Sequence, residues 1–288
     1  MRRVRRGTGF AYVDLAGRRV GDPDTLERVR GLGIPPAWQE VWICGDPRGH
    51  LQATGIDGAG RKQYLYHPVW RELRDRQKFE TMEEFAAALP RLRRQVSADL
   101  ESTDQPSRER VLACAARLLD VGFFRIGGEE YAKEDGGVGL ATLRPEHVTF
   151  DGDSAVFSYP AKSGVQRNHF VADPDVVAVL TSLRRRRGGP AELLAHRAGR
   201  HWHPLHSDEI NDYVKLHLGE EFSAKDFRTW NATVLAAVAL ARHAEDQKAQ
   251  RTKTSRKRVQ SAVAREVAEL LGNTPAVARR SYIDPRVF

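Results

Sequence analysis

Four side chains of this 288-residue sequence stand in contexts that suit chemistry on a charged group. Tyr282 lies near the end of the sequence within Ala-Arg-Arg-Ser-Tyr-Ile. Arg125 lies within Gly-Phe-Phe-Arg-Ile-Gly-Gly, Lys162 opens a Lys-Ser-Gly turn, and Arg228 lies within Lys-Asp-Phe-Arg-Thr-Trp. A phenol can act as a nucleophile, a guanidinium group can hold an anion with a planar fork of donors, and an ammonium group can release a proton. Taken singly, each is more often a packing or surface residue, so only their joint order and flanking residues carry information.

No cofactor or metal motif accompanies these residues. The sequence contains no Walker loop, no Gly-rich dinucleotide fingerprint and no His-Glu-x-x-His motif. The one histidine cluster comprises His201, His203 and His206, and we interpret it as a polar loop ahead of a helix that begins near Ser207, rather than as a zinc site. We therefore expect neither a cofactor nor a metal ion.

The first part of the chain is typical of a small twisted sheet with one helix. Runs rich in aromatic and β-branched residues, bounded by Gly-Asp turns, predict strands at 10–15, 40–44 and 51–54. Asp22 as N-cap and Pro23 in the first turn predict a short helix, which the following glycines and prolines end.

From about His67 the pattern becomes mainly helical. Thr81, with Glu84 three residues later, predicts a capping box. Residues 107–120 carry apolar side chains at helical spacing. A short β region then interrupts the helices, with predicted strands at 147–150, 155–159 and 168–171.

Helices are expected from the β region to the end of the chain. Long stretches rich in Ala, Leu and Val predict helices at 229–243 and 259–271. Gly272 and Pro275 end the second of these, because proline cannot continue it, and a last short segment covers 276–282.

Composition limits the classes of protein that the chain can belong to. It is 41% hydrophobic and 29% charged, which favours a soluble globular protein, and no apolar run is long enough to span a bilayer. The basic N-terminus lacks the apolar segment of a secretory signal. Cys44 and Cys114 are isolated, which predicts two buried thiols in a reducing cytoplasm.

A net charge of +8 favours a polyanionic partner, because phosphate contacts release condensed counterions. Two basic runs have alternative interpretations. Residues 184–187 are either a solvated helix end or a non-specific phosphate contact, and the first is favoured. Residues 252–258 are equally well a phosphate-facing stretch or a solvated connector between helices.

The order and contexts of these motifs resemble those of type IB DNA topoisomerases, in particular the short bacterial and poxvirus-like branch. Arg125 precedes a turn and Val-Gly-Leu-Ala-Thr-Leu at 138–143, Lys162 lies in a hairpin turn, and Arg228 lies in Lys-Asp-Phe-Arg-Thr. Gly-Asn-Thr-Pro at 272–275 precedes Tyr282. The resemblance extends over nearly the whole chain.

The resemblance implies an α+β protein with two domains that form a clamp around duplex DNA. Residues 1–78 would be a small β-rich N-terminal DNA-binding domain. Residues 79–288 would be a larger, mainly α-helical catalytic domain that contains the short β-hairpin sheet. It further implies a monomer that acts on double-stranded DNA in the cytoplasm, at the nucleoid, without contact with a membrane.

The resemblance also assigns catalytic roles. Tyr282 would attack a DNA phosphorus and take the 3′ phosphate, Arg125 and Arg228 would hold the nonbridging oxygens, and Lys162 would protonate the departing 5′ oxygen. Resealing would need no ATP, because the phosphotyrosyl bond keeps the energy of the phosphodiester. Asn273 stands where many relatives carry histidine, and we interpret it as a neutral hydrogen-bond donor to a nonbridging oxygen.

A second set of residues resembles the family's DNA contacts. The N-terminal motif is Gly-Arg-Lys-Gln-Tyr-Leu-Tyr at 60–66. Strand alternation places Tyr64 and Tyr66 on one side, where they could contact bases or the sugar-phosphate backbone, and Gln63 could read a base edge. Candidate DNA contacts are Arg61, Lys62, Gln63, Tyr64, Tyr66 and Tyr131.

Two alternatives remain open. A tyrosine recombinase uses the same chemistry, but recombinases usually carry histidine where this chain has Lys225, and their N-terminal DNA-binding domain is usually helical. A basic DNA-binding protein without catalysis would have the same charge but no use for Tyr282.

Overall fold

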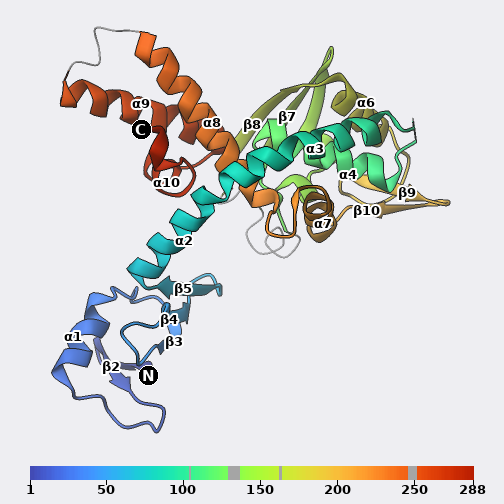
Figure 1. Cartoon of the computed structure of the whole chain (residues 1–288). Helices are drawn as coiled ribbons and strands as arrows, with labels where there is room; N and C mark the ends of the chain where they lie inside the picture. The colour runs from blue at the N-terminus through green and yellow to red at the C-terminus, as the bar shows by residue number, and fades with distance from the viewer. Residues whose placement is uncertain (104, 129–136, 162–163, 246–251) are drawn as a thin grey trace. The chain divides into compact units, whose positions relative to one another are not determined.

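The computed structural model describes residues 1–103, 105–128, 137–161, 164–245 and 252–288 (Figure 1). The chain divides into two compact units, Met1–Lys78 and Phe79–Phe288. Helix α2 (Pro68–Glu80) begins in the first unit and carries the chain into the second. The first unit is mainly an antiparallel sheet and the second is mainly helical, so the predicted α+β fold class is confirmed.

The first unit is a five-stranded antiparallel sheet in the order β2-β1-β3-β4-β5 with one short helix. Its elements are β1 (Arg2–Arg6), β2 (Gly9–Val13), α1 (Pro23–Gly31), β3 (Gln39–Ile43), β4 (Leu51–Ile56) and β5 (Lys62–Tyr66). The predicted strands are confirmed to within about two residues, whereas β1 was not predicted. Asp22 caps α1 as expected, since its carboxylate accepts from the Thr25 N–H at 2.9 Å.

The second unit contains seven helices, five strands and three short 3₁₀ turns among its described residues. The helices are α3 (Met82–Glu101), α4 (Arg108–Gly122), α6 (Pro174–Arg184), α7 (Ser207–Leu218), α8 (Ala224–Glu245), α9 (Lys253–Leu271) and α10 (Pro275–Ser281). The strands are β6 (Val148–Asp151), β7 (Ser154–Pro160), β8 (Gln166–Ala172), β9 (Ala195–Ala198) and β10 (His201–Pro204). The 3₁₀ turns are η1 (Leu140–Thr142), η2 (Pro145–His147) and η4 (Pro285–Val287). Strands β6, β7 and β8 form one antiparallel sheet, and β9 pairs with β10.

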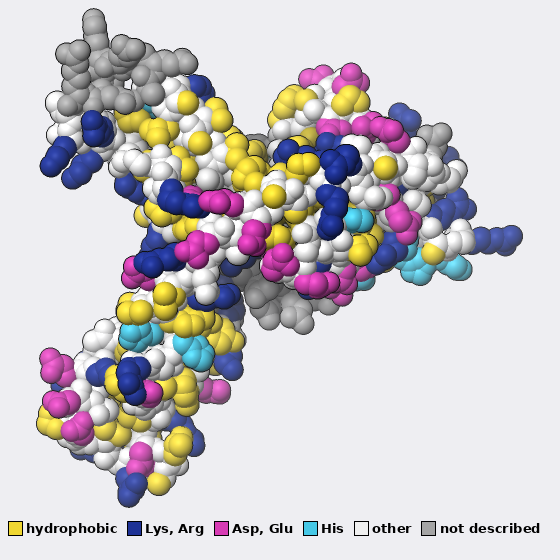
Figure 2. Space-filling model, in the orientation of Figure 1, with side chains coloured by type: hydrophobic (Ala, Val, Ile, Leu, Met, Phe, Trp, Pro, Cys, Tyr) yellow, Lys and Arg dark blue, Asp and Glu magenta, His cyan; other side chains and the backbone are white. Residues whose placement is uncertain are grey.

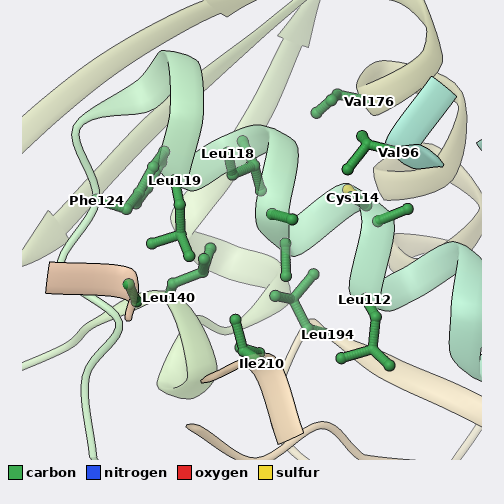
Figure 3. Packing of buried hydrophobic residues seen from close by; sticks show 14 of the residues in the cluster. Val96, Leu112, Cys114, Leu118, Leu119, Phe124, Leu140, Val176, Leu194 and Ile210 are labelled. Atoms are coloured by element: carbon green, nitrogen blue, oxygen red, sulfur yellow. The ribbon is translucent and has the colours of Figure 1, made fainter. Parts of the chain in front are cut away.

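Helix α4 is the centre of the larger hydrophobic core (Figure 3). The predicted apolar stripe is confirmed, but the helix is buried on nearly every side because α3, α6, α7 and α8 all pack against it. Leu118 and Leu119 are almost fully buried, and Cys114 is completely buried. A separate apolar cluster joins α8 to α9 and includes Ile283, directly after Tyr282.

Three sequence expectations were wrong in this unit. The chain after β8 is not helical throughout, because β9 and β10 form a hairpin, so that His201 and His203 lie in a strand rather than in a loop. Residues 253–258 form the first turns of α9, which Thr252 caps, so the interpretation as a connector between helices is wrong, whereas a phosphate-facing stretch stays a prediction. Thr81 makes no side-chain capping bond, because its backbone is helical and α2 leads almost directly into α3.

Two further expectations need adjustment. Cys44 is only half-buried, although both cysteines are free as expected. The basic run after α6 is not uniformly solvated, since the Arg186 guanidinium donates to the carbonyls of Pro190 and Leu193, both at 2.6 Å. The described residues contain no group of three or more His, Cys, Asp or Glu side chains that could hold a metal ion. In the same residues, no helix is both long enough and apolar enough to cross a membrane.

The buried position of Leu118 gives a stability prediction. We expect Leu118→Ala to lower the free energy of unfolding by about 2–5 kcal/mol, because the lost methyl groups leave a cavity in a core that cannot fully collapse. Denaturant titration followed by circular dichroism measures this. Leu216→Ala is the matched control, because Leu216 is 71% exposed on α7. Equal losses in the two variants would contradict the assignment of α4 to the core.

Candidate active site

The backbone that carries Arg125 is held from both sides. Helix α4 ends at Gly122, its C-cap residue Phe123 has a left-handed backbone (φ 58°), and the next residue, Phe124, is fully buried against Phe157. The carbonyl of Arg125 then accepts from the Leu140 N–H at 2.8 Å. The local sequence therefore turns the chain sharply out of α4 and pins Arg125 beside the η1 turn.

Two glycines allow this arrangement. A Cβ atom on Gly127 would lie 2.7 Å from the Cα atom of Gly139, and a Cβ atom on Gly139 would collide with the Gly127 backbone. The two segments can approach only because both residues lack a side chain. These glycines belong to the sequence motifs that flank Arg125, which explains why the flanks were as informative as the arginine itself.

Arg228 lies near the start of α8 and is only 4% exposed. Its guanidinium donates to the Phe123 carbonyl and to the Leu271 carbonyl, each at 2.8 Å. Both acceptors lie at the C-terminal ends of helices, where unpaired carbonyls and the helix dipole favour a cation. Burial lowers the pKa of Arg228 to about 10, and the nearby Arg125 charge acts in the same direction. The Nε atom of Arg228 is buried without a hydrogen-bond partner among the described residues, so a donor remains for an added ligand.

The end of α9 brings three arginines together. The carbonyls of Glu269 and Leu270 accept from Arg167, and the Leu271 carbonyl accepts from Arg228. The Gly272 carbonyl lies 3.4 Å from the Arg125 Nη2 atom. The last carbonyls of a helix have no partner within the helix, so they attract cations from neighbouring elements. One helix end thus places guanidinium groups from β8, α8 and the segment after α4 side by side.

Asn273 follows directly and has a defined orientation. Its Oδ1 atom accepts from the Arg125 Nη2 atom at 2.7 Å. A guanidinium group can only donate, so the amide nitrogen must point the other way. That Nδ2 atom is buried and has no hydrogen-bond partner among the described residues. Because an unpaired buried donor is costly, the site is suited to receive an acceptor there.

Tyr282 is the C-cap residue of α10 and lies beside Arg228 and Arg125. The Arg228 Cζ atom lies 5.2 Å from the centre of the tyrosine ring. Burial alone would raise the pKa of Tyr282, but the charges of Arg228 and Arg125, together with hydrogen bonds to both, outweigh burial and lower the pKa below that of an ordinary tyrosine. The phenol is therefore easier to deprotonate, as a nucleophile at this position requires.

The segment after Tyr282 is firmly anchored. The Thr233 hydroxyl on α8 donates to the Tyr282 carbonyl at 3.3 Å and accepts from the Asp284 N–H at 3.1 Å. Ile283 is fully buried in the cluster between α8 and α9. Arg286 then binds the buried Asp284 carboxylate at 2.7 Å, and it also contacts the first turn of α3. The tyrosine backbone is thus fixed to the helix that carries Arg228.

Sequence reasoning did not single out three residues of β7 and β8 that lie beside this site. Burial raises the pKa of Tyr159 to about 12, although Arg167, Arg228 and Arg125 act against it. Burial, aided by Arg167 and Arg228, lowers the pKa of His169 to about 4, so this imidazole is neutral at physiological pH. Alternation along β8 places Arg167 and His169 on one face and could have predicted them.

Two predicted residues cannot be placed. Lys162 and Tyr131 lie outside the described residues, so their proposed roles rest on the sequence alone. The described parts of the connection between β7 and β8 agree with the predicted turn, since Gly164 has φ +71°.

In the first unit, β5 carries the predicted aromatic pair on one side. The rings of Tyr64 and Tyr66 stack with centres 6.2 Å apart, and Tyr66 stacks on Trp70 of α2 at 4.6 Å. Tyr64 is 48% exposed, and the Lys62 ammonium lies 6.0 Å from its ring centre. Trp70 was not predicted to take part, and it extends this surface of rings and cations.

Asp57 orients two other candidates of this unit. Its Oδ2 atom accepts from the Arg61 Nε atom at 3.0 Å and from the Gln63 Nε2 atom at 2.9 Å. One N–H of the Gln63 amide is therefore engaged, which leaves its second N–H and its carbonyl oxygen to contact a partner.

Basic side chains gather at the outer end of α9 in the second unit. Figure 2 shows dark blue side chains at the outer end of α9, and the exposed residues there are Lys253, Arg256, Lys257 and Arg258. The first turn of α9 contains no acidic residue, so the positive end of the helix dipole adds to these charges.

Comparison with known proteins places these features in context. Residues 67–284 match the family described as the catalytic core of eukaryotic DNA topoisomerase I, and residues 9–57 match the N-terminal domain of bacterial DNA topoisomerase IB. A DNA topoisomerase 1B of Acanthamoeba polyphaga mimivirus is 27% identical over 98% of this chain and 84% of its own length. The DNA topoisomerase 1B of vaccinia virus (strain Copenhagen) is 22% identical over 80% of this chain and 69% of its own. In contrast, a DNA topoisomerase 1 of Candidozyma auris is 28% identical over 75% of this chain but only 29% of its own length.

The electrostatics of Tyr282 give a pH prediction. Arg125→Gln should raise the pKa of Tyr282, because burial raises this pKa and only one of the two cations that lower it would remain. The phenolate form would therefore appear at higher pH than in the unmodified protein. Ultraviolet absorbance titration measures it, with the Tyr282→Phe signal subtracted. Arg200→Gln is a control that removes one charge from the exposed turn between β9 and β10. If Arg125→Gln leaves the titration midpoint where it was, the two arginines do not set the acidity of this phenol.

Proposed function

Because the chain belongs to the family of type IB DNA topoisomerases, we propose that it relaxes supercoiled duplex DNA through a transient 3′-phosphotyrosyl break in one strand. The observation that carries the proposal is the contact of one half-buried phenol with two guanidinium groups, which lower its pKa. A buried phenol without that contact would be less acidic than usual and a poor nucleophile.

The cleavage step needs a nucleophile, charge stabilisation and a proton donor. The Tyr282 oxygen attacks the phosphorus, the bond from phosphorus to the 5′ oxygen breaks, and the DNA leaves with a 5′-hydroxyl. Lys162 is proposed to supply the proton that the 5′ oxygen takes up, a role for which arginine is too weak an acid. Resealing is the reverse reaction, in which the 5′-hydroxyl attacks the phosphotyrosyl bond and releases Tyr282. Neither direction consumes ATP.

Arg125 and Arg228 are proposed to hold the nonbridging oxygens. The support is their shared position at the end of α9, next to the Tyr282 ring. The unpartnered Nε atom of Arg228 offers one donor for a phosphate oxygen. Preorganised donors of this kind stabilise the charge that develops in a transition state without the cost of rearrangement.

Asn273 is proposed to complete this set as a neutral donor. Its oxygen is held by Arg125, so its buried nitrogen is the group that can reach a nonbridging oxygen.

The first unit, residues 1–78, is proposed as a DNA-binding domain that closes with residues 79–288 around the duplex. Its DNA contacts would be Arg61, Lys62, Gln63, Tyr64 and Tyr66, with Tyr131 from the second domain. We propose that the active form is a monomer and that it acts in the cytoplasm.

A plasmid assay tests the proposed function. The protein should relax supercoiled plasmid in EDTA and without ATP, and Tyr282→Phe should abolish this activity because the variant has no hydroxyl to attack phosphorus. Denaturant added during the reaction should trap protein on a 3′ DNA end. A tyrosine recombinase would instead exchange strands between two specific sites, and a non-catalytic DNA-binding protein would be indifferent to Tyr282→Phe. Failure of the intact protein to relax plasmid or to form the adduct refutes the proposal.

The role of Asn273 gives a separate prediction. Asn273→Ala should slow single-turnover cleavage by about 10²-fold, the usual cost of losing one preorganised donor to a transition-state oxygen. Asn273→His should keep most of the rate, because a neutral imidazole also donates one hydrogen bond. The measurement is the rate of covalent adduct formation on a DNA duplex at saturating protein. An alanine variant that cleaves as fast as the unmodified protein would remove Asn273 from the mechanism.

A further inference from the structure

Arg167 is a third guanidinium at the candidate active site, and the proposed mechanism gives it no task. It lies on β8 and is half-buried. Its two terminal nitrogens donate to the consecutive carbonyls of Glu269 and Leu270, with the first at 2.9 Å. The hydrogen bonds of Arg167 thus go to the backbone at the end of α9, whereas Arg125 also binds the Asn273 side chain and Arg228 also lies against the Tyr282 ring.

The guanidinium of Arg167 also lies directly against Gly272. A Cβ atom on Gly272 would be 2.7 Å from both the Cζ and the Nη1 atoms of Arg167. Gly272 has φ +62°, so it is also the residue at which the chain leaves α9. The turn from α9 into Asn273 is thus held on one side by Arg167 and on the other by Arg125, which contacts both the Gly272 carbonyl and the Asn273 side chain.

Placing a third cation here has an electrostatic cost. Arg125 lies close enough to lower the pKa of Arg167, in addition to the larger effect of burial. A surface arginine would avoid both costs, so the position is favourable only through the carbonyls that Arg167 neutralises at the negative end of α9. The contacts of Arg167 therefore stabilise one conformation of the C-terminal end of α9.

We propose that Arg167 is a positioning residue that fixes the Gly272 turn and so aims the amide nitrogen of Asn273 at the reacting phosphate. The inference rests on the proposed function. Arg167 acts through the backbone of the turn and does not touch the substrate, so its contribution to cleavage exists only while Asn273 has a donor to aim.

Single variants test the first part. Arg167→Ala should slow single-turnover cleavage by about tenfold, less than the loss from removing the Asn273 donor itself, because a misaimed donor still binds part of the time. DNA affinity should stay close to that of Arg200→Ala, which removes an equal charge from the exposed turn between β9 and β10. Arg167→Lys should recover part of the rate, since an ammonium group can still neutralise the helix end.

A double-mutant cycle tests the coupling. In an Asn273→Ala background, Arg167→Ala should cause little further loss, because residues that act through one another are not additive. A purely structural role for Arg167 would instead lower the rate by the same factor in both backgrounds, and that result overturns the proposal, as does an Arg167→Ala variant with normal cleavage.

Thermal unfolding of each variant separates misfolding from misplacement. If Arg167→Ala does not fold, the same cycle is carried out with Arg167→Lys. The decrease in cleavage rate that Arg167→Lys causes must then likewise disappear in the Asn273→Ala background. The two proposals also fail differently. If the unmodified protein forms no covalent adduct with DNA, the proposed function is wrong, whereas normal adduct formation with an additive cycle refutes only the role of Arg167.

Discussion

The arrangement of the candidate active site depends on one buried cation, Arg228. Taking a guanidinium out of water is costly unless its donors are satisfied and its charge is offset. Here the carbonyls of Phe123 and Leu271 accept its hydrogen bonds, and each lies where a helix ends. The cation therefore requires the ends of α4 and α9 to converge on the start of α8. Because α4 leads into Arg125 and α9 leads into Asn273, this convergence also brings those two residues together.

Tyr282 is held next to Arg228 by hydrogen bonds that join the backbone of Tyr282 and of Asp284 to α8, the helix that carries Arg228. Thr233 lies just over one helical turn after Arg228 on α8, and its hydroxyl binds the backbone on both sides of Ile283. The Arg228 charge in turn acts on the Tyr282 ring. Two residues of one helix thus control the position and the acidity of the phenol. A change in the tilt of α8 would move both together, so the distance from the cation to the nucleophile is protected against small rearrangements.

The parts of this structure that depend on local chemistry could be predicted from the sequence. Asp22 with Pro23 marked a helix start, Gly272 marked a helix end, and the motif flanks identified Arg125, Arg228 and Tyr282 as a set. The parts that depend on tertiary contacts could not. Nothing local to Arg167 shows that it binds carbonyls about a hundred residues away, and the short β9–β10 hairpin has too few residues to outweigh a helical expectation. Thr81 followed the pattern of a helix cap, yet the continuation of α2 into α3 left it no helix start to cap.

The same electrostatics explain why asparagine is a suitable residue at position 273. His169 is the one imidazole whose pKa is set by burial next to Arg167 and Arg228, and its pKa falls to about 4. A histidine in place of Asn273 would lie beside Arg125 and face the same cluster of guanidinium groups, so the surroundings would favour its neutral form as well. In that form histidine offers one N–H donor and no charge, which is what the Asn273 amide already supplies. The site gets its positive charge from arginines, which stay protonated at physiological pH because even the buried Arg228 keeps a pKa of about 10, and needs from residue 273 only a correctly aimed hydrogen bond.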